Sequence, residues 1–332
     1  MVQLEFPALA ESHVLEICAG AGGQALGLEG AGFGLAAAVE LDKHACATLQ
    51  MNRPHWTVLQ GDVRDISGCA FRGVELLAGG VPCPPFSVAG RKLGADDERD
   101  LFPEALRLAE EVRPLAIMLE NVRGLAGDEF APYRASILEQ LHRLGYEADY
   151  RVLNASDFGL PQLRPRFVLV AMRPRYMVRF RWPGCSSLRS TVGDALHDLM
   201  GSKGWPGTNQ WRKRASGVGP TLVGGSKKHG GPDLGPTRAR TRWALLGVDG
   251  LGIANEPPGE HFPFEGMPRL TVRMAARLQG FPDTWQFSGA KTPAYRQVGN
   301  AFPPPVAQAV GTAIRRALTG QDCGAYPDAA KR

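Results

Sequence analysis

Cysteine is scarce in this sequence, and its few copies lie far apart. The chain has six cysteines and no C-x-x-C pair; they are Cys18, Cys46, Cys69, Cys83, Cys185 and Cys323. This spacing is typical of neither a disulfide framework nor a structural zinc site, and it fits a reducing cytosol. We therefore expect no metal centre.

Long apolar runs are also missing. No stretch approaches about 18 uninterrupted apolar residues, and the first residues lack the basic patch and apolar core of a secretory leader. The sequence thus predicts a cytoplasmic protein with no membrane partner. Its 332 residues can form one large domain or two.

Acidic residues are rare in one part of the chain. Between Arg173 and Arg242 there are fourteen basic residues but only three acidic ones. The same segment is rich in glycine and contains Trp182, Trp205 and Trp211, and Trp243 follows it directly. Such a segment fits a solvated surface or a nucleic-acid-binding face, and the nearly neutral N-terminal half favours the second.

Strand-like and helix-like segments alternate in the first half of the chain. The predicted strands cover 14–18, 35–40, 56–59, 74–78, 117–119 and 167–171, and the predicted helices cover 25–29, 43–52, 102–112 and 132–144. This alternation predicts an α/β fold with a mostly parallel, doubly wound sheet.

The alternation stops after Pro174 and is replaced by an irregular basic segment up to about Gly266. Helices are predicted again at 271–278, where Thr271 is an N-cap, and at 303–318. In the second helix, Val306, Ala309, Val310, Ala313 and Ile314 are expected to face inward. The sequence therefore predicts an α/β domain that is interrupted by an irregular basic domain and completed by a C-terminal helix.

One cysteine follows a predicted buried strand directly. Gly79 and Gly80 break strand 74–78, and the segment Val81-Pro82-Cys83-Pro84-Pro85-Phe86 comes next. Strand ends in α/β sheets are where catalytic groups collect, and prolines stiffen the loop. From this segment alone, Cys83 is either a nucleophile or a small buried hydrophobic residue.

Three further strand ends carry residues that suit an adenosine ligand. Gly20-x-Gly22-x-x-Ala25 follows the first strand and opens a helix, which suits close approach of backbone to ligand. Glu40 ends the second strand, where it can accept from ribose hydroxyls, and Asp62 ends the third. A dinucleotide and S-adenosylmethionine both fit this pattern.

Polar motifs near the remaining strands add possible chemistry. Glu120 follows the strand Ile117–Leu119 within Glu120-Asn121-Val122, and Gln162-Leu163-Arg164-Pro165-Arg166 places two arginines at alternate positions. Gln297-Val298-Gly299-Asn300 lies near the C-terminus. Taken singly, the acid and the arginines also fit ordinary surface salt bridges.

Together and in this order, the motifs resemble those of the DNA (cytosine-5) methyltransferase family. The resemblance extends from Glu16 to about Val306 and rests on E-I-C-A-G-A-G-G, P-C-P-P-F-S, E-N-V, Q-L-R-P-R, L-T-V-R-M-A-A-R-L-Q-G-F-P and Q-V-G-N. It implies an S-adenosylmethionine-dependent, Rossmann-like catalytic domain in residues 1–178 and 267–332. A small irregular target-recognition domain would occupy residues 179–266.

The resemblance also implies roles for individual residues. Cys83 would attack C6 of a cytosine flipped out of the duplex, Glu120 would act at N3, Arg166 would contact O2, and Arg164 would orient the acid. Residues 90–99 would form a loop that closes over DNA. The implied S-adenosylmethionine-binding residues are Cys18, Ala19, Gly20, Gly22, Gly23, Glu40, Leu41, Asp62, Val63, Leu101 and Asn300.

Several positions depart from the family pattern. The family usually has Asp and Phe where Glu16 and Cys18 stand, and the smaller side chain of Cys18 predicts weaker stacking on adenine. Gln is common at Pro84, and Glu is common at Met274.

The implied partner is double-stranded DNA. The implied enzyme is a monomer in the cytoplasm at the nucleoid, paired in function with a restriction endonuclease. Four other interpretations remain: a tRNA cytosine-5 methyltransferase, a methyltransferase acting on exocyclic amino groups of DNA, an NAD-dependent oxidoreductase, and a catalytically silent DNA-binding module.

Overall fold

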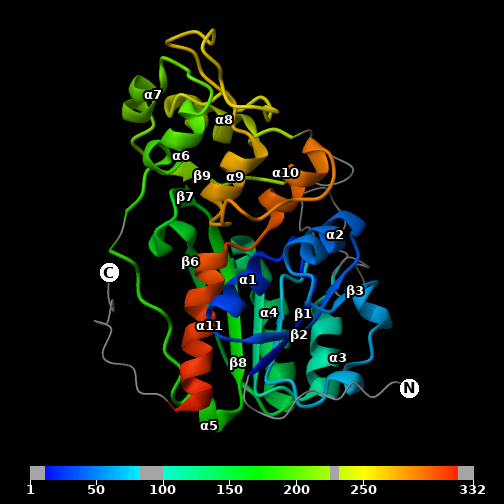
Figure 1. The fold of residues 1–332 in the computed structure, drawn as a ribbon. Coiled ribbons are helices and arrows are strands. Elements are labelled where there is room, and N and C mark those ends of the chain that lie inside the picture. Colours follow the sequence, from blue (N-terminus) through cyan, green and yellow to red (C-terminus); the bar gives the residue numbers. More distant parts are fainter. Residues whose placement is uncertain (1–11, 83–99, 188, 225–231, 321–332) are drawn as a thin grey trace.

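A seven-stranded sheet forms the centre of the molecule (Figure 1). The computed structural model describes residues 12–82, 100–187, 189–224 and 232–320. The strand order is β3-β2-β1-β4-β5-β8-β6. The strands are β1 (His13–Ile17), β2 (Gly34–Glu40), β3 (Val58–Gln60), β4 (Leu76–Gly79), β5 (Ala116–Val122), β6 (Glu147–Asn154) and β8 (Pro165–Met172).

Strands β1 to β5 are parallel, and only β8 runs against its neighbours β5 and β6. The predicted mostly parallel α/β sheet is therefore confirmed. Strand β6 was not predicted, because it lies at the sheet edge and most of its side chains are exposed or half-buried. An edge strand needs no continuous apolar run.

Helices cover both faces of this sheet, as a doubly wound fold requires (Figure 1). Helices α3 and α4 share a core with Leu15 and Ile17 on one face. Helices α1 and α11 share a core with Val14 and Met118 on the other face. The helices are α1 (Gly23–Gly30), α2 (Lys43–Asn52), α3 (Phe102–Val112), α4 (Ala131–Arg143), α5 (Pro174–Met177) and α11 (Pro304–Thr319).

The N-termini of these helices follow local sequence signals. Asp42 caps α2 by accepting from the backbone N–H groups of His44 and Ala45 at 2.9 and 3.3 Å. Pro103 occupies the first turn of α3, where no N–H is needed. Short 3-10 helices connect the main elements at Val63–Asp65, Gly68–Phe71, Arg123–Ala126, Asp128–Phe130 and Ala155–Phe158.

Helix α11 was predicted closely, and its inward face was predicted in part. Val306, Val310 and Ile314 are fully buried, whereas Ala309 and Ala313 are only half-buried. The helix packs on α1, where a Cβ added to Gly27 would lie 2.5 Å from the Cβ of Ala307. The C-terminal part of the chain therefore returns to the first strand-helix unit.

Most of the basic segment of residues 179–266 lies above the carboxyl ends of the strands, whereas its first residues rise along the side of the sheet from α5 (Figure 1). It contains α6 (Val192–Gly201), α7 (Thr208–Arg214), α8 (Thr237–Leu245) and β9 (Gly219–Pro220), which pairs with β7 (Gln162–Leu163). The sequence predicted no helices here, because frequent glycine and proline interrupt the apolar periodicity that would indicate these short helices.

Three tryptophans of the basic segment have a structural role. Trp205, Trp211 and Trp243 are buried and belong to one hydrophobic cluster. A Cβ added to Gly219 would collide with the ring of Trp243. Their assignment to a nucleic-acid-binding face is therefore wrong, since these rings fill the core of the segment, while Trp182 is half-buried outside that cluster.

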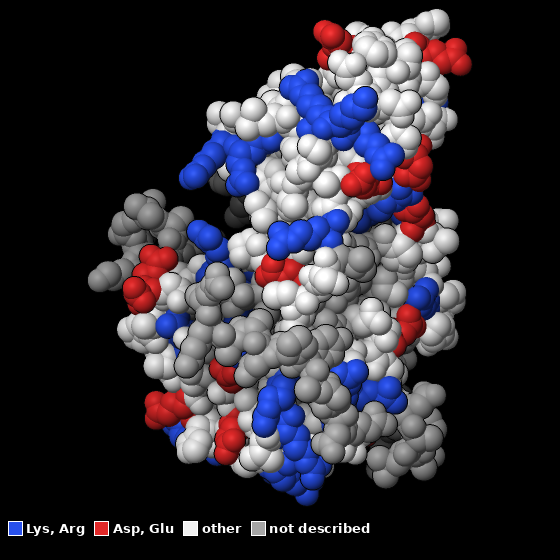
Figure 2. Space-filling view, turned by 90° about the vertical axis from the view of Figure 1, so that its left-hand side faces the viewer, with Lys and Arg blue, Asp and Glu red and all other residues white. Residues whose placement is uncertain are grey.

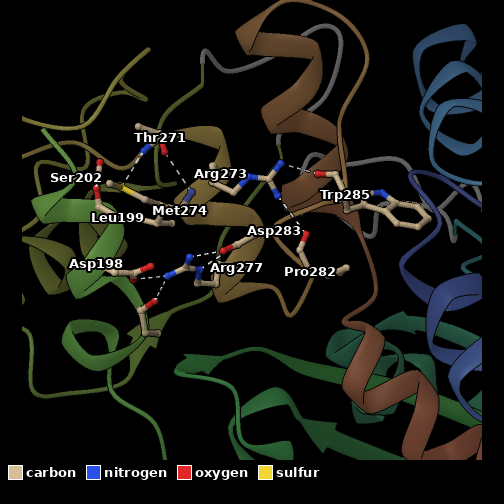
Figure 3. Close-up of polar contacts among 11 residues, drawn as sticks. Asp198, Leu199, Ser202, Thr271, Arg273, Met274, Arg277, Pro282, Asp283 and Trp285 are labelled. Carbon is tan, nitrogen blue, oxygen red and sulfur yellow. Dashed lines mark hydrogen bonds and ion pairs between the residues drawn. The ribbon is translucent and has the colours of Figure 1, made fainter.

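Helix α9 (Val272–Leu278) attaches the basic segment to the rest of the chain (Figure 3). The Arg277 guanidinium donates to Asp198 and to the carbonyl oxygen of Ala195 in α6, and it also pairs with Asp283. Thr271 caps α9 as predicted, and its N–H donates to the Met274 sulfur at 3.4 Å. The thioether thus takes the place that a glutamate carboxylate has in a capping box.

Candidate active site

The carboxyl ends of β1, β2, β4 and β5 meet at a cavity of about 460 Å³. Pro293, Arg296 and Asn300 of α10 (Lys291–Asn300) form its upper wall. Its size suits a nucleoside-sized ligand. The remaining lining residues are Glu16, Cys18, Ala19, Gly20, Ala21, Gln24, Glu40, Leu41, Asp42, Ala45, Gly80, Glu120, Gln297, Ala301 and Phe302.

The glycine loop after β1 shapes the floor of this cavity. Gly20 adopts a φ of 54° and Cys18 a φ of 52°, so the chain turns sharply at the strand end. The Gly20 N–H donates to Oε2 of Glu40 at 2.7 Å, and the Asp42 N–H donates to Oε1 at 2.7 Å. The Glu40 carboxylate therefore ties two strand ends together and faces the cavity.

Some of the predicted S-adenosylmethionine-binding residues line this cavity, and others do not. Lining residues are Cys18, Ala19, Gly20, Glu40, Leu41 and Asn300. Gly22 and Gly23 lie outside the lining, where a side chain would collide with Leu49 or with the backbone of Phe302. These two glycines allow α1 to pack closely against its neighbours, a role that sequence spacing does not distinguish from ligand contact.

Asp62, Val63 and Leu101 also lie outside the cavity lining. Asp62 is an N-cap and forms an ion pair with Arg64 at 2.7 Å, which lowers the pKa of its carboxyl. Val63 is buried in the core beneath the sheet. Leu101 is half-buried at the start of α3. Their contacts with the methyl donor stay predictions.

Two cavity residues were missed by the sequence analysis. Glu16 and Gln24 are 1 % and 3 % exposed, and Oε2 of Glu16 and Oε1 of Gln24 have no hydrogen-bond partner among the described residues. Burial, together with the charge of Glu40, raises the pKa of Glu16 well above its ordinary value. The sequence offers one signal that Glu16 is a functional residue, because it is a charged residue inside an otherwise apolar strand.

The unpartnered oxygens give a test of whether the cavity fits S-adenosylmethionine. That molecule carries an ammonium group and ribose hydroxyls, and each is a hydrogen-bond donor. Glu16, Gln24 and Glu40 present acceptors to the cavity, so the residues present fit the group.

We expect Glu16→Gln to stabilise the protein without methyl donor at alkaline pH. The pKa of Glu16 is higher in the folded state than in the unfolded state, where it lies at about 4.3. The stability that this group contributes is therefore complete below the unfolded pKa and is lost as the pH rises through the folded pKa. Calorimetry at pH 8 should show a Tm several degrees above wild type, with a smaller difference at pH 5.

The matched control is Glu110→Gln, which changes an exposed carboxyl on α3. It should leave Tm almost unchanged at both pH values. A Glu16→Gln difference that does not vary with pH would contradict the assignment of a raised pKa.

The predicted acid, Glu120, lies at the edge of the same cavity. It lies near the carboxyl end of β5, is 8 % exposed, and its Oε1 pairs with Nε of Arg166 at 2.8 Å. Burial raises the pKa of Glu120, although the charges of Arg166 and Arg164 partly oppose this effect. A buried carboxyl with a raised pKa can hold a proton for transfer.

The expected role of Arg164 requires a correction. Arg164 is fully buried, and its guanidinium donates to the carbonyl oxygens of Leu222, Gly299 and Ala301 at 2.7 to 2.9 Å. The side chain that contacts Glu120 is that of Arg166. The alternate spacing predicts both guanidiniums on one side of a strand, and the resemblance implies that Arg164 orients the acid, but Arg164 lies just before β8, between β7 and the basic segment.

Cys83 and the predicted closing loop 90–99 lie outside the described residues. The chain that leads to Cys83 is held beside the acid: the Asn121 side chain donates to the Val81 carbonyl oxygen at 2.7 Å. The Leu101 N–H donates to the Pro82 carbonyl oxygen at 3.2 Å. Strands β4 and β5 are parallel neighbours, with Gly79 opposite Leu119.

The other cysteines near the cavity are poor nucleophiles. Burial, with the charges of Glu40 and Asp62, raises the pKa of Cys18 to about 12. Burial and the Glu40 charge raise the pKa of Cys46 to about 11. Because the thiolate is the reactive form, neither Cys18 nor Cys46 is suited to act as a nucleophile at neutral pH.

The α/β fold and the cavity at its strand ends suit an enzyme that binds a nucleoside and transfers a chemical group. Comparison with known proteins identifies the family. Residues 12–316 match the family of C-5 cytosine-specific DNA methylases, so the chain belongs to this family. It is a DNA cytosine-5 methyltransferase, and the family implies S-adenosylmethionine as the methyl donor. The interpretations as an amino methyltransferase, an oxidoreductase or a silent DNA-binding module are therefore wrong.

Particular relatives are similar over nearly all of the chain. The type II methyltransferase M.NaeI of Lentzea aerocolonigenes is 56 % identical over 310 residues, covering 92 % of this chain and 75 % of the relative. M.NgoMIV of Neisseria gonorrhoeae is 54 % identical, covering 92 % and 97 %. The structure of a prophage-encoded DNA modification methyltransferase of E. coli has a TM-score of 0.66 at 25 % identity, covering 92 % and 99 %.

The sequence predicts neither a metal centre nor a membrane-spanning segment. Among the described residues, no group of three or more His, Cys, Asp and Glu could hold a metal ion. None of the described helices has the length and apolar character of a membrane span.

Proposed function

We propose that the protein methylates C5 of one cytosine within a specific double-stranded DNA sequence, as part of a restriction-modification system. Residues 1–178 and 267–332 would form the catalytic domain, and residues 179–266 would recognise the target. The observation that supports this most strongly is the shared cavity. Glu40 and Asn300, which are proposed to bind the methyl donor, line the same cavity as the proposed acid Glu120.

The proposed chemistry begins with activation of the cytosine ring. The Cys83 thiolate forms a bond to C6, and the electron pair of the C5–C6 double bond moves toward N3, where Glu120 supplies a proton. Arg166 holds the acid and contacts O2 of the base. The enamine that results is nucleophilic at C5.

The later steps return the cysteine to its starting state. Bound S-adenosylmethionine supplies an electrophilic methyl group on a sulfonium centre. After C5 takes the methyl group and a neutral thioether leaves, a base removes the C5 proton and the C5–C6 double bond forms again. The bond between C6 and Cys83 then breaks, releasing the thiolate, and the proton on N3 returns to Glu120. Because C5 and C6 are stacked in a duplex, the base must leave the helix, which costs a few kcal/mol.

The proposed activity can be tested by expressing the protein in a host that lacks DNA methylation. Bisulfite sequencing of the host DNA should find 5-methylcytosine at one recurring sequence. Methylation of tRNA with unmodified DNA, or no modified cytosine at all, would contradict the proposal. The same experiment would give the recognition sequence. We further propose that the protein acts as a monomer in the cytoplasm.

Basic side chains of residues 179–266 would supply DNA affinity. Figure 2 shows groups of lysine and arginine side chains on the upper part of the molecule. Some are ion-paired, as Arg212 is with Asp194. Arg238 and Arg242 are exposed one turn apart on α8, and no ion pair to either occurs among the described residues. They are free to contact phosphates.

DNA affinity is expected to fall steeply with salt, because each neutralised phosphate releases counterions. Replacing Arg238 and Arg242 together by alanine should reduce the slope of log K against log salt by about 2. Fluorescence anisotropy with a labelled duplex between 50 and 200 mM salt measures this slope. Arg212→Ala is the control, since Asp194 already neutralises this side chain; an unchanged slope in the double variant would exclude both arginines as phosphate contacts.

A further inference from the structure

A buried polar cluster joins the basic segment to the methyl-donor cavity. Gln162, Arg164 and Gln279 are all fully buried and hydrogen-bonded. Gln162 accepts from the Leu222 N–H at 3.0 Å and donates to Oε1 of Gln279 at 2.6 Å. Buried polar groups of this kind fix geometry, because an unmet hydrogen bond is costly in the interior.

The same cluster holds the end of α10. Arg164 donates to the carbonyl oxygens of Gly299 and Ala301 at 2.8 and 2.9 Å. Gln279 donates to the Ala301 carbonyl oxygen at 3.0 Å. The backbone is therefore fixed on both sides of Asn300, which is exposed and lines the donor cavity.

The basic segment also lies directly against Asn300. A Cβ added to Gly224 would collide with the side-chain oxygen of Asn300 and would lie 2.5 Å from the Arg296 carbonyl oxygen. A Cβ added to Gly299 would lie 2.7 Å from the carbonyl carbon of Val223. Two glycines meet here, and neither position has room for a methyl group.

We propose that residues 219–224 of the basic segment form a supporting wall of the methyl-donor site, with Gly224 as a positioning residue that acts through Asn300. This inference rests on the proposed function and extends it, because it makes donor affinity depend on the target-recognition part of the chain. By linkage, DNA that moves this segment changes donor affinity, and bound donor changes DNA affinity by the same factor.

The test is the variant Gly224→Ala, with binding of S-adenosylmethionine measured by calorimetry without DNA. We expect the donor Kd to rise about tenfold, the effect of a moderate steric clash. The KM for donor should rise equally, while kcat at saturating donor stays within about twofold, because a fully occupied site restores the reacting geometry. Unchanged donor affinity, or a loss of kcat with unchanged KM, would overturn the proposal.

A double-mutant cycle tests whether the effect passes through Asn300. If it does, Gly224→Ala combined with Asn300→Ala should lose less donor affinity than the sum of the two single losses, although the clash with the Arg296 carbonyl oxygen remains. Fully additive losses would overturn the proposal. Gly217→Ala is the matched control in the same segment, since its Cβ would meet only the flexible Leu246 side chain at 3.1 Å.

Gln279→Met is a second variant, in case Gly224→Ala does not fold. It removes the hydrogen bonds to Val298 and Ala301 at similar volume, and the donor Kd should again rise. Calorimetry needs no turnover, so the outcome is separate from that of the proposed function. A wild-type protein that binds donor but methylates no cytosine contradicts the function alone, whereas normal donor affinity in both variants contradicts only this inference.

Discussion

Cys83→Ser is expected to abolish methyl transfer while DNA binding stays measurable. A serine hydroxyl is almost entirely protonated at neutral pH, so it cannot add to C6 as a thiolate does. Loss of a nucleophile costs about 10⁴-fold or more in kcat in enzymes of comparable design. Transfer of labelled methyl groups to a duplex containing the mapped site measures the change.

The covalent step can be observed directly. A duplex with 5-fluorocytosine at the target should trap wild-type protein, because fluorine at C5 cannot leave as a proton does. The trapped complex should survive denaturing electrophoresis, and Cys83→Ser should give none. The control Cys69→Ser, an exposed free cysteine, should behave as wild type. Methylation that continues in Cys83→Ser at the wild-type rate would end the nucleophile assignment.

Glu120→Gln is expected to lower kcat by about 10²- to 10⁴-fold, the range for loss of a general acid. Glutamine keeps the shape and a hydrogen-bond donor but has no proton to transfer. The ion pair with Arg166 would also be lost, leaving a buried guanidinium without its carboxylate. Single-turnover methyl transfer separates this step from product release.

The matched control for the acid is Glu139→Gln, on the exposed side of α4. It should keep wild-type kcat. If Glu120→Gln retains full activity with normal stability, N3 is not protonated by this residue.

The sheet was predictable because its central strands are short apolar runs that end in glycine or an acid. The mostly parallel, doubly wound sheet followed from that alternation, whereas the strand order did not. The basic segment was not predictable in the same way. Its core depends on Trp205, Trp211 and Trp243. Trp211 and Trp243 pack against glycines distant in sequence, so no regular period marks its helices.

The site residues show the same contrast between those that the sequence could place and those that it could not. Glu40 and Glu120 could be placed at the cavity because each stands at a strand end that is visible in the sequence, whereas Asn300 was implied only by the family resemblance. Arg164 could not be separated from Arg166 by spacing alone, because its partners are backbone carbonyls contributed by two remote segments. Glu16 was hidden inside an apolar strand.

The return of α10 and α11 to the first strand-helix unit has a consequence for biosynthesis. The cavity floor is made by residues of the first strand-helix unit, whereas Asn300, Ala301 and Phe302 come from a segment that is translated much later. Until that segment has left the ribosome, the cavity lacks this wall. A premature stop codon ahead of α10 would therefore leave the cavity without its upper wall.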